Sequence, residues 1–175
     1  GPEMAVNMLN ENLDLDIQDY VSVNFLALAD VIDMVDGITV KMTDEEVVHM
    51  NNYCVETSKV TGKKYKKIEP AVAGTYKLNG VQAVSYARIR YTAGGDYKRT
   101  ERQRLVLEKA ANKLKKQNLA TINKIVDKVM PEVSTSFSTK EILALASGAF
   151  DFELGETRGF PFDLETPDSV PSLRQ

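Results

Sequence analysis

Cysteine, histidine and tryptophan are almost missing from this sequence of 175 residues, which has one cysteine, one histidine and no tryptophan. A single cysteine, Cys54, excludes an internal disulfide framework and any zinc site built from several thiolates. With His49 as the only histidine, a zinc enzyme that uses histidine and cysteine ligands is disfavoured. We expect both residues to be structural, because they fall in one predicted helix but lie more than one turn apart.

Long hydrophobic runs are missing as well. No apolar run approaches the roughly 18 residues of a membrane span, and the first residues lack the basic segment and apolar core of a signal peptide. We therefore expect the chain as given to be soluble. With 43% hydrophobic and 27% charged residues, the composition is that of a globular protein of one domain, which excludes wholesale disorder.

Charge is distributed unevenly along the chain, although the formal net charge is only -3. Residues 1–58 carry twelve acidic side chains and one basic one, and residues 129–175 carry eight acidic and three basic ones. Residues 59–128 carry eighteen basic and five acidic side chains. This basic middle third suggests an anionic partner for that segment. The alternative is that the three segments neutralise one another within the fold.

Hydrophobic periodicity predicts alternating helices and strands over the first sixty residues. We expect helices over 4–12, 26–36 and 43–57, and strands over 20–25 and 38–42. Gly37 is placed to end the second helix, and Thr43 with Glu46 has the spacing of a capping box that opens the third. The succession of strand, helix and strand predicts the α/β class.

The rest of the chain is predicted to be mainly helical. We expect a loop or short hairpin over 58–74, a helix over 80–86, an extended segment over 87–91, helices over 97–117 and 120–130, and an irregular segment from 150 onward. A second capping box, Ser138 with Glu141, opens a helix to about residue 149. The buried face of the helix over 97–117 is expected to carry Val106, Leu107, Ala110, Ala111 and Leu114.

Two arginines in the extended segment have the pattern of an anion-binding site. On a strand, Arg88 and Arg90 project from one face about 7 Å apart, where the two guanidinium groups repel each other unless an anion or a carboxylate lies between them. Guanidinium groups match phosphate oxygens in bidentate fashion. The spacing therefore predicts an anion between these two side chains.

The helix that follows provides a second wall for the site. Arg99 and Gln103 lie four residues apart and share a face, close to the helix N-terminus with its partial positive charge and free N–H donors. Asp96 is expected to cap this helix and can also pair with an arginine, while Gly94-Gly95 allows a tight turn. The net charge of +4 over residues 88–104 suits a pyrophosphate.

Two alternatives to an anion site stay open on spacing alone. The arginines can cover solvent-facing surface or pair with the acidic segments of the chain. The basic helix can also bind DNA or RNA. Since no aromatic side chains interleave with its basic residues and no helix-turn-helix precedes it, we expect no nucleic-acid partner.

The residues around the arginines resemble the signature of the LytR–CpsA–Psr family. The resemblance rests on AVSYARIRY at 83–91, GDYKRTERQR at 95–104 and LNGVQA at 78–83, and upstream on GPE at 1–3, NENLDLDI at 10–17 and YVSVNF at 20–25. The paired arginines combined with the later Asp, Arg and Arg-Gln are far more specific than any arginine pair. By this resemblance, residues 1–165 are the C-terminal portion of the family's catalytic domain, and 166–175 are an irregular tail.

The resemblance implies a mixed β-sheet sandwiched between helices and a phosphotransferase activity. Such proteins are anchored in the Gram-positive cell membrane by an N-terminal helix, with the catalytic domain on the extracellular face. They look like ligases that move an anionic glycopolymer, such as wall teichoic acid or capsular polysaccharide, from undecaprenyl pyrophosphate to peptidoglycan. The implied partners are therefore a polyprenyl-pyrophosphate-linked glycopolymer, peptidoglycan and, through the anchor, a membrane.

Residue roles are also carried over from the resemblance. The pyrophosphate would be bound by Arg88, Arg90, Arg99 and Gln103. The catalytic candidates are Arg88, Arg90 and Asp96. Mg²⁺ would bridge phosphate oxygens. A capping role explains Asp96 equally well. The lipid tail would lie in an apolar slot, and the candidate lining residues are Phe25, Leu28, Val31, Ile32 and Val35. The alternative for these residues is ordinary core packing.

The sequence departs from the family pattern at its N-terminal side. The anchor helix is absent, and so is the segment with a Ser-Ile-Pro-Arg-Asp type motif, which supplies metal-binding aspartates and further arginines. We therefore assign no metal ligand in this chain and expect unpaired sheet edges. We expect a truncated or cleaved product with weak or no transferase activity. The alternative function is a non-catalytic regulatory domain that binds a polyanion or a lipid pyrophosphate, of the transcriptional attenuator type.

Overall fold

The computed structural model describes residues 1–92, 95–138, 140–142 and 144. The α-helices are α1 (Pro2–Leu13), α2 (Phe25–Met34), α3 (Asp44–Thr61), α4 (Gly80–Ala87), α5 (Gly95–Leu114) and α6 (Leu119–Val129). The strands are β1 (Val21–Val23), β2 (Ile38–Met42), β3 (Gly74–Leu78) and β4 (Val133–Thr135), the last preceded by a 3-10 turn, η1 (Met130–Glu132). No helix in this described part combines the length and apolar character that crossing a bilayer would need.

The strands pair into two antiparallel sheets of two strands each. In one sheet β2 lies beside β3, with Ile38 opposite Leu78, and in the other β1 lies beside β4, with Val21 opposite Thr135. The predicted α/β class is confirmed. Within the described ranges the two pairs stay separate and antiparallel, and do not join into the single mixed sheet that the family resemblance implies. Among the described residues each pair therefore has unpaired edges, as expected.

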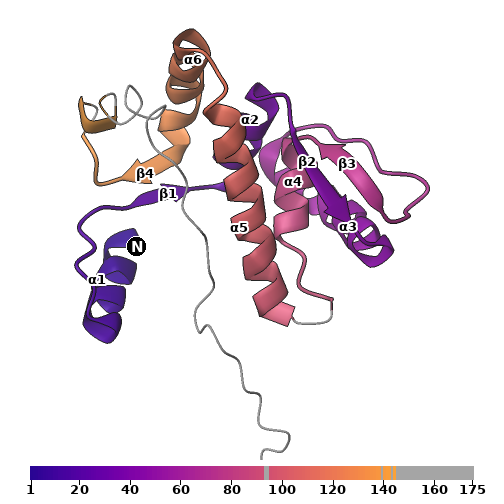
Figure 1. Cartoon of the computed structure of the whole chain (residues 1–175), viewed down its shortest axis with the longest axis horizontal. Coiled ribbons are helices and arrows are strands. Elements are labelled where there is room, and N and C mark those ends of the chain that lie inside the picture. Colours follow the sequence, from indigo (N-terminus) through magenta and orange to yellow (C-terminus); the bar gives the residue numbers. More distant parts are fainter. Residues whose placement is uncertain (93–94, 139, 143, 145–175) are drawn as a thin grey trace, which may run out of the picture.

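The body of the molecule consists of β2, β3 and the helices α2 to α5 (Figure 1). Along β2, Ile38, Val40 and Met42 are buried while Thr39 and Lys41 are exposed, which is the pattern of a strand with one face on a core. Helices α3 and α4 pack closely against each other on this core. Its largest fully buried side chains include Ile32, Ile38, Met50, Leu78 and Ile89.

The start of α4 is fixed against α2 by a glycine. A Cβ atom at Gly80 would lie 2.1 Å from the carbonyl oxygen of Ala29, so only glycine permits this close approach. The Gly80 N–H donates to Asp33 Oδ1 at 2.6 Å. Asn79 and Gln82 add a capping box at the same end of the helix, which satisfies two further backbone donors. These contacts set the position of α4, whose other end carries Arg88.

The N-terminal flank, defined here as α1, β1 and β4, lies on the opposite side of α5 from β2 and β3 (Figure 1). Helix α1 has no buried residue, and all three residues of β1 are exposed. Helix α6 lies above this flank and packs on α2. A small second core forms there from Ala27 and Val35 of the α2 region and Ile125 and Val129 of α6.

The predicted helices that fall within residues 1–130 are present with shifted ends. Helix α2 ends at Met34 because Asp36 and Gly37 adopt φ angles of 63° and 73°. The Gly37 N–H then bonds to the carbonyl oxygen of Ile32 at 2.8 Å, so Gly37 does help to close the helix as predicted. The capping box at the start of α3 is confirmed, but that helix continues to Thr61.

Other predictions need correction. Strands β3 and β4 were not predicted, and the segment over 87–91 is not extended. Leu107 was expected to be buried but is 51% exposed, whereas Val106 and Ala110 are buried as predicted. The second capping box is present, since the Ser138 N–H donates to Glu141. The predicted helix to 149 and the irregular segment after 150 lie mostly or wholly outside the described residues.

Candidate functional site

Arg88 is held at the end of α4, and its backbone is helical. Its φ of -90° and ψ of -9° continue the helix, and its N–H bonds to the carbonyl oxygens of Val84 and Ser85. The predicted strand over 87–91 is therefore wrong, because the helical hydrogen bonds run one residue past Ala87. Arg88 caps the C-terminal end of α4 and Arg90 lies just beyond the helix, so the two do not project from one face of a strand.

The Arg88 side chain is partly buried and lies against two aromatic rings. Its guanidinium carbon lies 4.8 Å from the centre of the Phe25 ring and 5.6 Å from that of Tyr53. Nη2 lies 2.9 Å from the Glu56 carboxylate, and Nη1 donates to Thr57 Oγ1 at 3.0 Å. Only 18% of the side chain is exposed. These contacts fix the guanidinium group and its charge at the floor of a pocket.

Arg90 and Arg99 approach each other through Asp96. One oxygen of this carboxylate lies 3.3 Å from Arg99 Nη1 and 4.0 Å from Arg90 Nε. Asp96 lies within the first turn of α5, which begins at Gly95, so the predicted N-cap position is corrected while the predicted pairing with an arginine is present. Gly95 has a φ of 48°, which favours glycine at this turn. Gly94 lies outside the described residues.

The four predicted pyrophosphate-binding side chains line one pocket of about 520 Å³. Its complete lining is Phe25, Tyr53, Arg88, Arg90, Tyr91, Arg99 and Gln103. We call this the arginine pocket. The Nε atom of Arg99 is buried and makes no hydrogen bond within the described ranges, which leaves a charged donor without an acceptor. Three guanidinium groups and an amide in one pocket form a site suited to a multiply charged anion.

Arg102 belongs to the predicted motif, but its buried pairing is not predicted from the sequence. Its Nε lies 2.9 Å from Glu46, and its Nη atoms donate to the carbonyl oxygen of Ile89 at 3.2 Å and to Thr92 Oγ1 at 2.7 Å. Only 5% of this residue is exposed. Arg102 thus holds the segment that presents Arg90 and Tyr91 to the pocket. A signal was available, because Arg102 lies four residues before the buried Val106 on α5.

Tyr86 lies beside this buried pair and remains a neutral phenol. Its ring centre is 5.9 Å from the Arg102 guanidinium carbon, and its hydroxyl donates to Glu46 at 3.5 Å. Burial, the largest effect, and the nearby carboxylate raise the pKa of Tyr86 to about 12. Tyr86 is therefore poorly suited to act as a general base near neutral pH.

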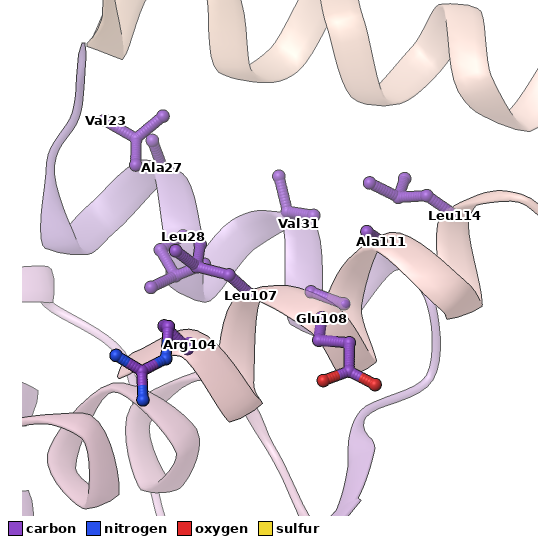
Figure 2. Close-up of a pocket in the computed structure, with 10 residues that line it drawn as sticks. Val23, Ala27, Leu28, Val31, Arg104, Leu107, Glu108, Ala111 and Leu114 are labelled. Atoms are coloured by element: carbon purple, nitrogen blue, oxygen red, sulfur yellow. The ribbon is translucent and has the colours of Figure 1, made fainter. Parts of the chain in front are cut away.

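A second depression, the apolar groove, lies between α2 and α5 and has a volume of about 480 Å³. Figure 2 shows Leu28 of α2 beside Leu107 of α5, with Val31 further along α2, while the charged ends of Arg104 and Glu108 point away from the apolar side chains. Of the residues predicted to line a lipid slot, these two on α2 line the groove.

The other three predicted lipid-slot residues do not line the groove. Ile32 and Val35 are 0% and 2% exposed and belong to the two cores, so ordinary core packing explains them. Phe25 lies in the arginine pocket instead. Cys54 is buried in the core as predicted, and burial raises the pKa of its thiol. His49 is only partly buried and lines a surface depression beside Tyr91.

Carboxylates at the arginine pocket are already engaged by arginines. Glu56 pairs with Arg88, and Asp96 pairs with Arg99. In the part of the chain that the structure describes, no three His, Cys, Asp or Glu side chains are grouped so that they would hold a metal ion. The residues present therefore do not fit a magnesium site of their own, because Mg²⁺ takes oxygen ligands in near-octahedral geometry.

Comparison with known proteins gives consistent matches. The chain is 33% identical to biofilm regulatory protein A of Streptococcus mutans over 138 residues, which are 78% of this chain and 32% of that protein. It is 31% identical to the polyisoprenyl-teichoic acid–peptidoglycan teichoic acid transferase TagV of Bacillus subtilis over 150 residues, which are 83% of this chain and 35% of that protein. The chain thus spans about a third of the length of these curated relatives.

The fold matches as well. The crystal structure of B. subtilis TagV is similar with a TM-score of 0.59 and 27% identity, over 87% of this chain and 54% of that chain. The LytR_cpsA_psr family matches residues 1–154. The predicted domain boundary at 165 and the predicted tail over 166–175 lie outside the described residues. With most of its length matched, the chain belongs to the LytR–CpsA–Psr family.

Proposed function

We propose that this chain is part of a phosphotransferase that moves an anionic glycopolymer from a polyprenyl pyrophosphate to peptidoglycan at the extracellular face of a cell membrane. Its own contribution to the active site is the pyrophosphate-binding wall. The single observation that carries the proposal is that Arg88, Arg90, Arg99 and Gln103 line one pocket although they come from two separate segments. The names of relatives such as TagV support the substrate class.

Each arginine has a distinct part in binding the diphosphate. Arg88 is fixed by Glu56 and supplies a pre-oriented charge, so little side-chain entropy is lost when an anion binds. Arg90 is 61% exposed and can close over the ligand. The Asp96 carboxylate offsets the repulsion between Arg90 and Arg99. A diphosphate carries more charge and more acceptor oxygens, and so competes with Asp96 for the same donors.

The same helices lead from the arginine pocket to the apolar groove. On α5, Gln103 lines the pocket and Leu107, four residues later on the same face, lines the groove. On α2, Phe25 lines the pocket and Leu28 lines the groove. An anionic site followed by an apolar groove suits a ligand with a diphosphate head and a hydrocarbon tail.

Magnesium remains part of the proposal for the full-length enzyme only. When bound, Mg²⁺ would supply charge neutralisation at the phosphate oxygens. The described residues do not form a site for it, so its ligands would come from another segment of the protein, and we expect this chain by itself to have weak or no transferase activity. This keeps open a second candidate function, a non-catalytic regulatory domain that binds a lipid pyrophosphate, which the name of the S. mutans relative favours.

The proposal is tested by calorimetric titration of the chain with inorganic pyrophosphate and with geranylgeranyl pyrophosphate. Arg90→Ala removes an exposed guanidinium group from the pocket and should lower the affinity for both ligands by about tenfold or more, since a hydrogen bond to a charged group contributes about 1.5–3 kcal/mol. The matched control is Lys98→Ala, because Lys98 is exposed, lies on α5 near the pocket and pairs with Glu101 outside it.

The control should change affinity by less than about threefold, since it alters the net charge equally but touches no ligand. Equal losses for both variants would mean that general charge attraction, and not the arginine pocket, binds the anion. Absence of pyrophosphate binding by the unaltered chain would overturn the proposed function outright.

A further inference from the structure

Part of the basic middle third of the chain is neutralised by acidic residues of the first third. Lys63 lies 2.7 Å from Asp30 and 2.5 Å from Asp33, both on α2. Similar ion pairs join Lys77 to Asp36, Arg88 to Glu56, and Arg102 to Glu46. The other lysines around Lys63 are different, because they are exposed and form no ion pair with any residue that the structure describes. They are Lys59, Lys64, Lys66 and Lys67.

Three of these lysines lie on the lysine strap, defined here as residues 62–69 in the connection from α3 to β3 (Figure 1). Side chains of α3 and of the start of α4 hold the strap by bonding to its backbone. Asn51 donates to the carbonyl oxygen of Ile68 at 3.0 Å and accepts from its N–H at 3.1 Å. The carbonyl oxygens of Lys63, Lys64 and Lys66 accept from Ser58 at 2.5 Å, Asn79 at 3.4 Å and Gln82 at 2.8 Å.

Two of the amides that hold the strap are themselves buried. Asn51 and Gln82 are 7% and 8% exposed, and a hydrogen bond shielded from water is stronger than an exposed one. Gln82 also completes the capping box at the start of α4, which ties the strap to that helix. A lysine on such a segment requires less ordering of the backbone when it binds a ligand than a lysine on a flexible loop.

The side chains of the strap are sorted by their surroundings. Tyr65 and Ile68 pack against the core of the body, whereas the lysines at 64, 66 and 67 stay exposed. Glu69 is the only acidic residue of the strap. Like charges held close together repel, and an anion that lies against them relieves this repulsion. The strap therefore presents an uncompensated row of positive charge.

A row of charges fits an extended polyanion better than it fits a single ion. Lys64 and Lys67 are three residues apart, and three residues of chain span at most about 10 Å. Neither of them lines the arginine pocket or the apolar groove. A bilayer surface fits less well, because Tyr65, the only aromatic residue of the strap, packs on the core and is not presented to a membrane interface.

We propose that the lysine strap binds a linear polyanion, which in the phosphotransferase is the charged part of the glycopolymer that follows the pyrophosphate. The identity of this ligand rests on the proposed function. Gln82, which holds the strap, lies six residues before Arg88 at the other end of α4, and six residues of α-helix rise about 9 Å. The strap and the arginine pocket are thus separate sites that one polymer can contact together. Phosphodiester and carboxylate polymers share the required chemistry.

The test measures binding of the chain to a short poly(glycerol phosphate), to polygalacturonate and to inorganic pyrophosphate. The strap variant combines Lys64→Gln, Lys66→Gln and Lys67→Gln. We expect it to bind one or both polymers about tenfold or more weakly. With poly(glycerol phosphate), the slope of log affinity against log salt should become shallower by about 2, since each lost phosphate contact removes about 0.7–0.9. Binding of inorganic pyrophosphate should stay within about threefold, since exposed distant charges are screened.

The matched control combines Lys109→Gln, Lys116→Gln and Lys124→Gln. These lysines lie on α5, after it and on α6, and none forms an ion pair within the described ranges. The control changes the net charge equally, so it should weaken polymer binding by less than about threefold if the strap is the site. A second variant places arginine at the three strap positions through Lys64→Arg, Lys66→Arg and Lys67→Arg. It keeps the charge and should stay within about threefold of the unaltered chain.

The outcomes separate this proposal from the proposed function. If pyrophosphate binds but the strap and control variants lose equal polymer affinity, the strap assignment is overturned and the proposed function stands. If a polymer binds through the strap while pyrophosphate does not bind, the proposed function is overturned and the strap remains a polyanion site. If no probe binds, both are overturned.

Vesicles test the alternative partner. Binding of the chain to phosphatidylglycerol vesicles, compared with phosphatidylcholine vesicles, should respond equally to the strap and control variants. A loss that is confined to the strap variant and to these anionic vesicles, with both polymers unaffected, would make the strap a membrane contact and overturn the proposal. Loss with poly(glycerol phosphate) alone assigns the strap to phosphodiester polymers, and loss with both polymers assigns it to polyanions of either kind.

Discussion

The body and the N-terminal flank differ in how their apolar side chains are used. In the body, β2, α3 and α4 place their apolar faces on one core, and side chains such as Met50 and Leu78 are 0% exposed. In the flank, Met4 and Met8 of α1 are 73% and 56% exposed. Local signals can form a helix in both regions, but only packing makes it a stable part of the fold. All residues of the arginine pocket lie in the body or in the segment joining α4 to α5.

In the body, Gly80→Ala is expected to cause the largest loss in the free energy of unfolding. The added Cβ would lie 2.1 Å from the Ala29 carbonyl oxygen, so α2 and α4 must move apart, and we expect a loss of about 3 kcal/mol or more in the free energy of unfolding. Denaturant unfolding measures it. The control is Gly62→Ala, where nothing lies within 4 Å and only the φ of +68° opposes a side chain.

At Gly62 we expect a loss of about 1–2 kcal/mol, the usual cost of the left-handed conformation for other residues. A smaller loss at Gly80 than at Gly62 would show that α2 and α4 can separate easily, and would remove the distinction between a tightly packed body and a loosely packed flank.

Arg102→Met is expected to cause the next largest loss in the free energy of unfolding. This change leaves the carboxylate of Glu46 partly buried without its partner, at a cost of about 3 kcal/mol in the free energy of unfolding. Arg104→Met, on the same helix, should stay within about 0.5 kcal/mol because Arg104 is less buried and lines only the groove edge. Thermal and denaturant unfolding compare the two variants.

A second change tests the cause of that loss. Glu46→Gln in the Arg102→Met background removes the unpaired charge and keeps a side chain that can complete the capping box with Thr43. We expect it to recover about half of the lost stability. No recovery would mean that the bonds of Arg102 to Ile89 and Thr92 stabilise the body more than its charge pair does.

The smallest change in the free energy of unfolding is expected for a substitution in the N-terminal flank. Met8→Ala on α1 should change the free energy of unfolding by less than about 0.5 kcal/mol, because this side chain is 56% exposed. The matched change Met50→Ala at a fully buried methionine of α3 should cost about 2–5 kcal/mol. Similar losses at the two positions would contradict the comparison and show that α1 is packed against another surface in solution.

The sequence predicts well those features that depend on neighbours along the chain. The alternation of β2, the Thr43–Glu46 capping box and the shared face of Arg99 and Gln103 are all local, and each is present. Strand β3 was missed because Gly74–Leu78 pairs with a strand more than thirty residues away, and its own pattern carries a glycine and a lysine with weak strand preference.

Features that depend on distant partners were predicted poorly. Arg102 is separated from Glu46 by 56 residues. Its spacing from Val106 on α5 places it on the buried face, but nothing near it in the sequence identifies Glu46 as its partner. The predicted extended segment over 87–91 is wrong because α4 includes Ala87 and its helical hydrogen bonds reach the Arg88 N–H. The arginine pocket was nevertheless predicted correctly, since Arg99 and Gln103 on α5 share a face through helical spacing alone.

Helix α5 also sets the length of a ligand that fills both the arginine pocket and the whole apolar groove. Gln103 lies in the first and Leu114 in the second, and eleven residues of α-helix rise about 16 Å. A prenyl chain shorter than this distance would leave the far end of the groove in contact with water. Affinity should therefore grow with each added isoprene unit until the chain reaches Leu114, and then level off.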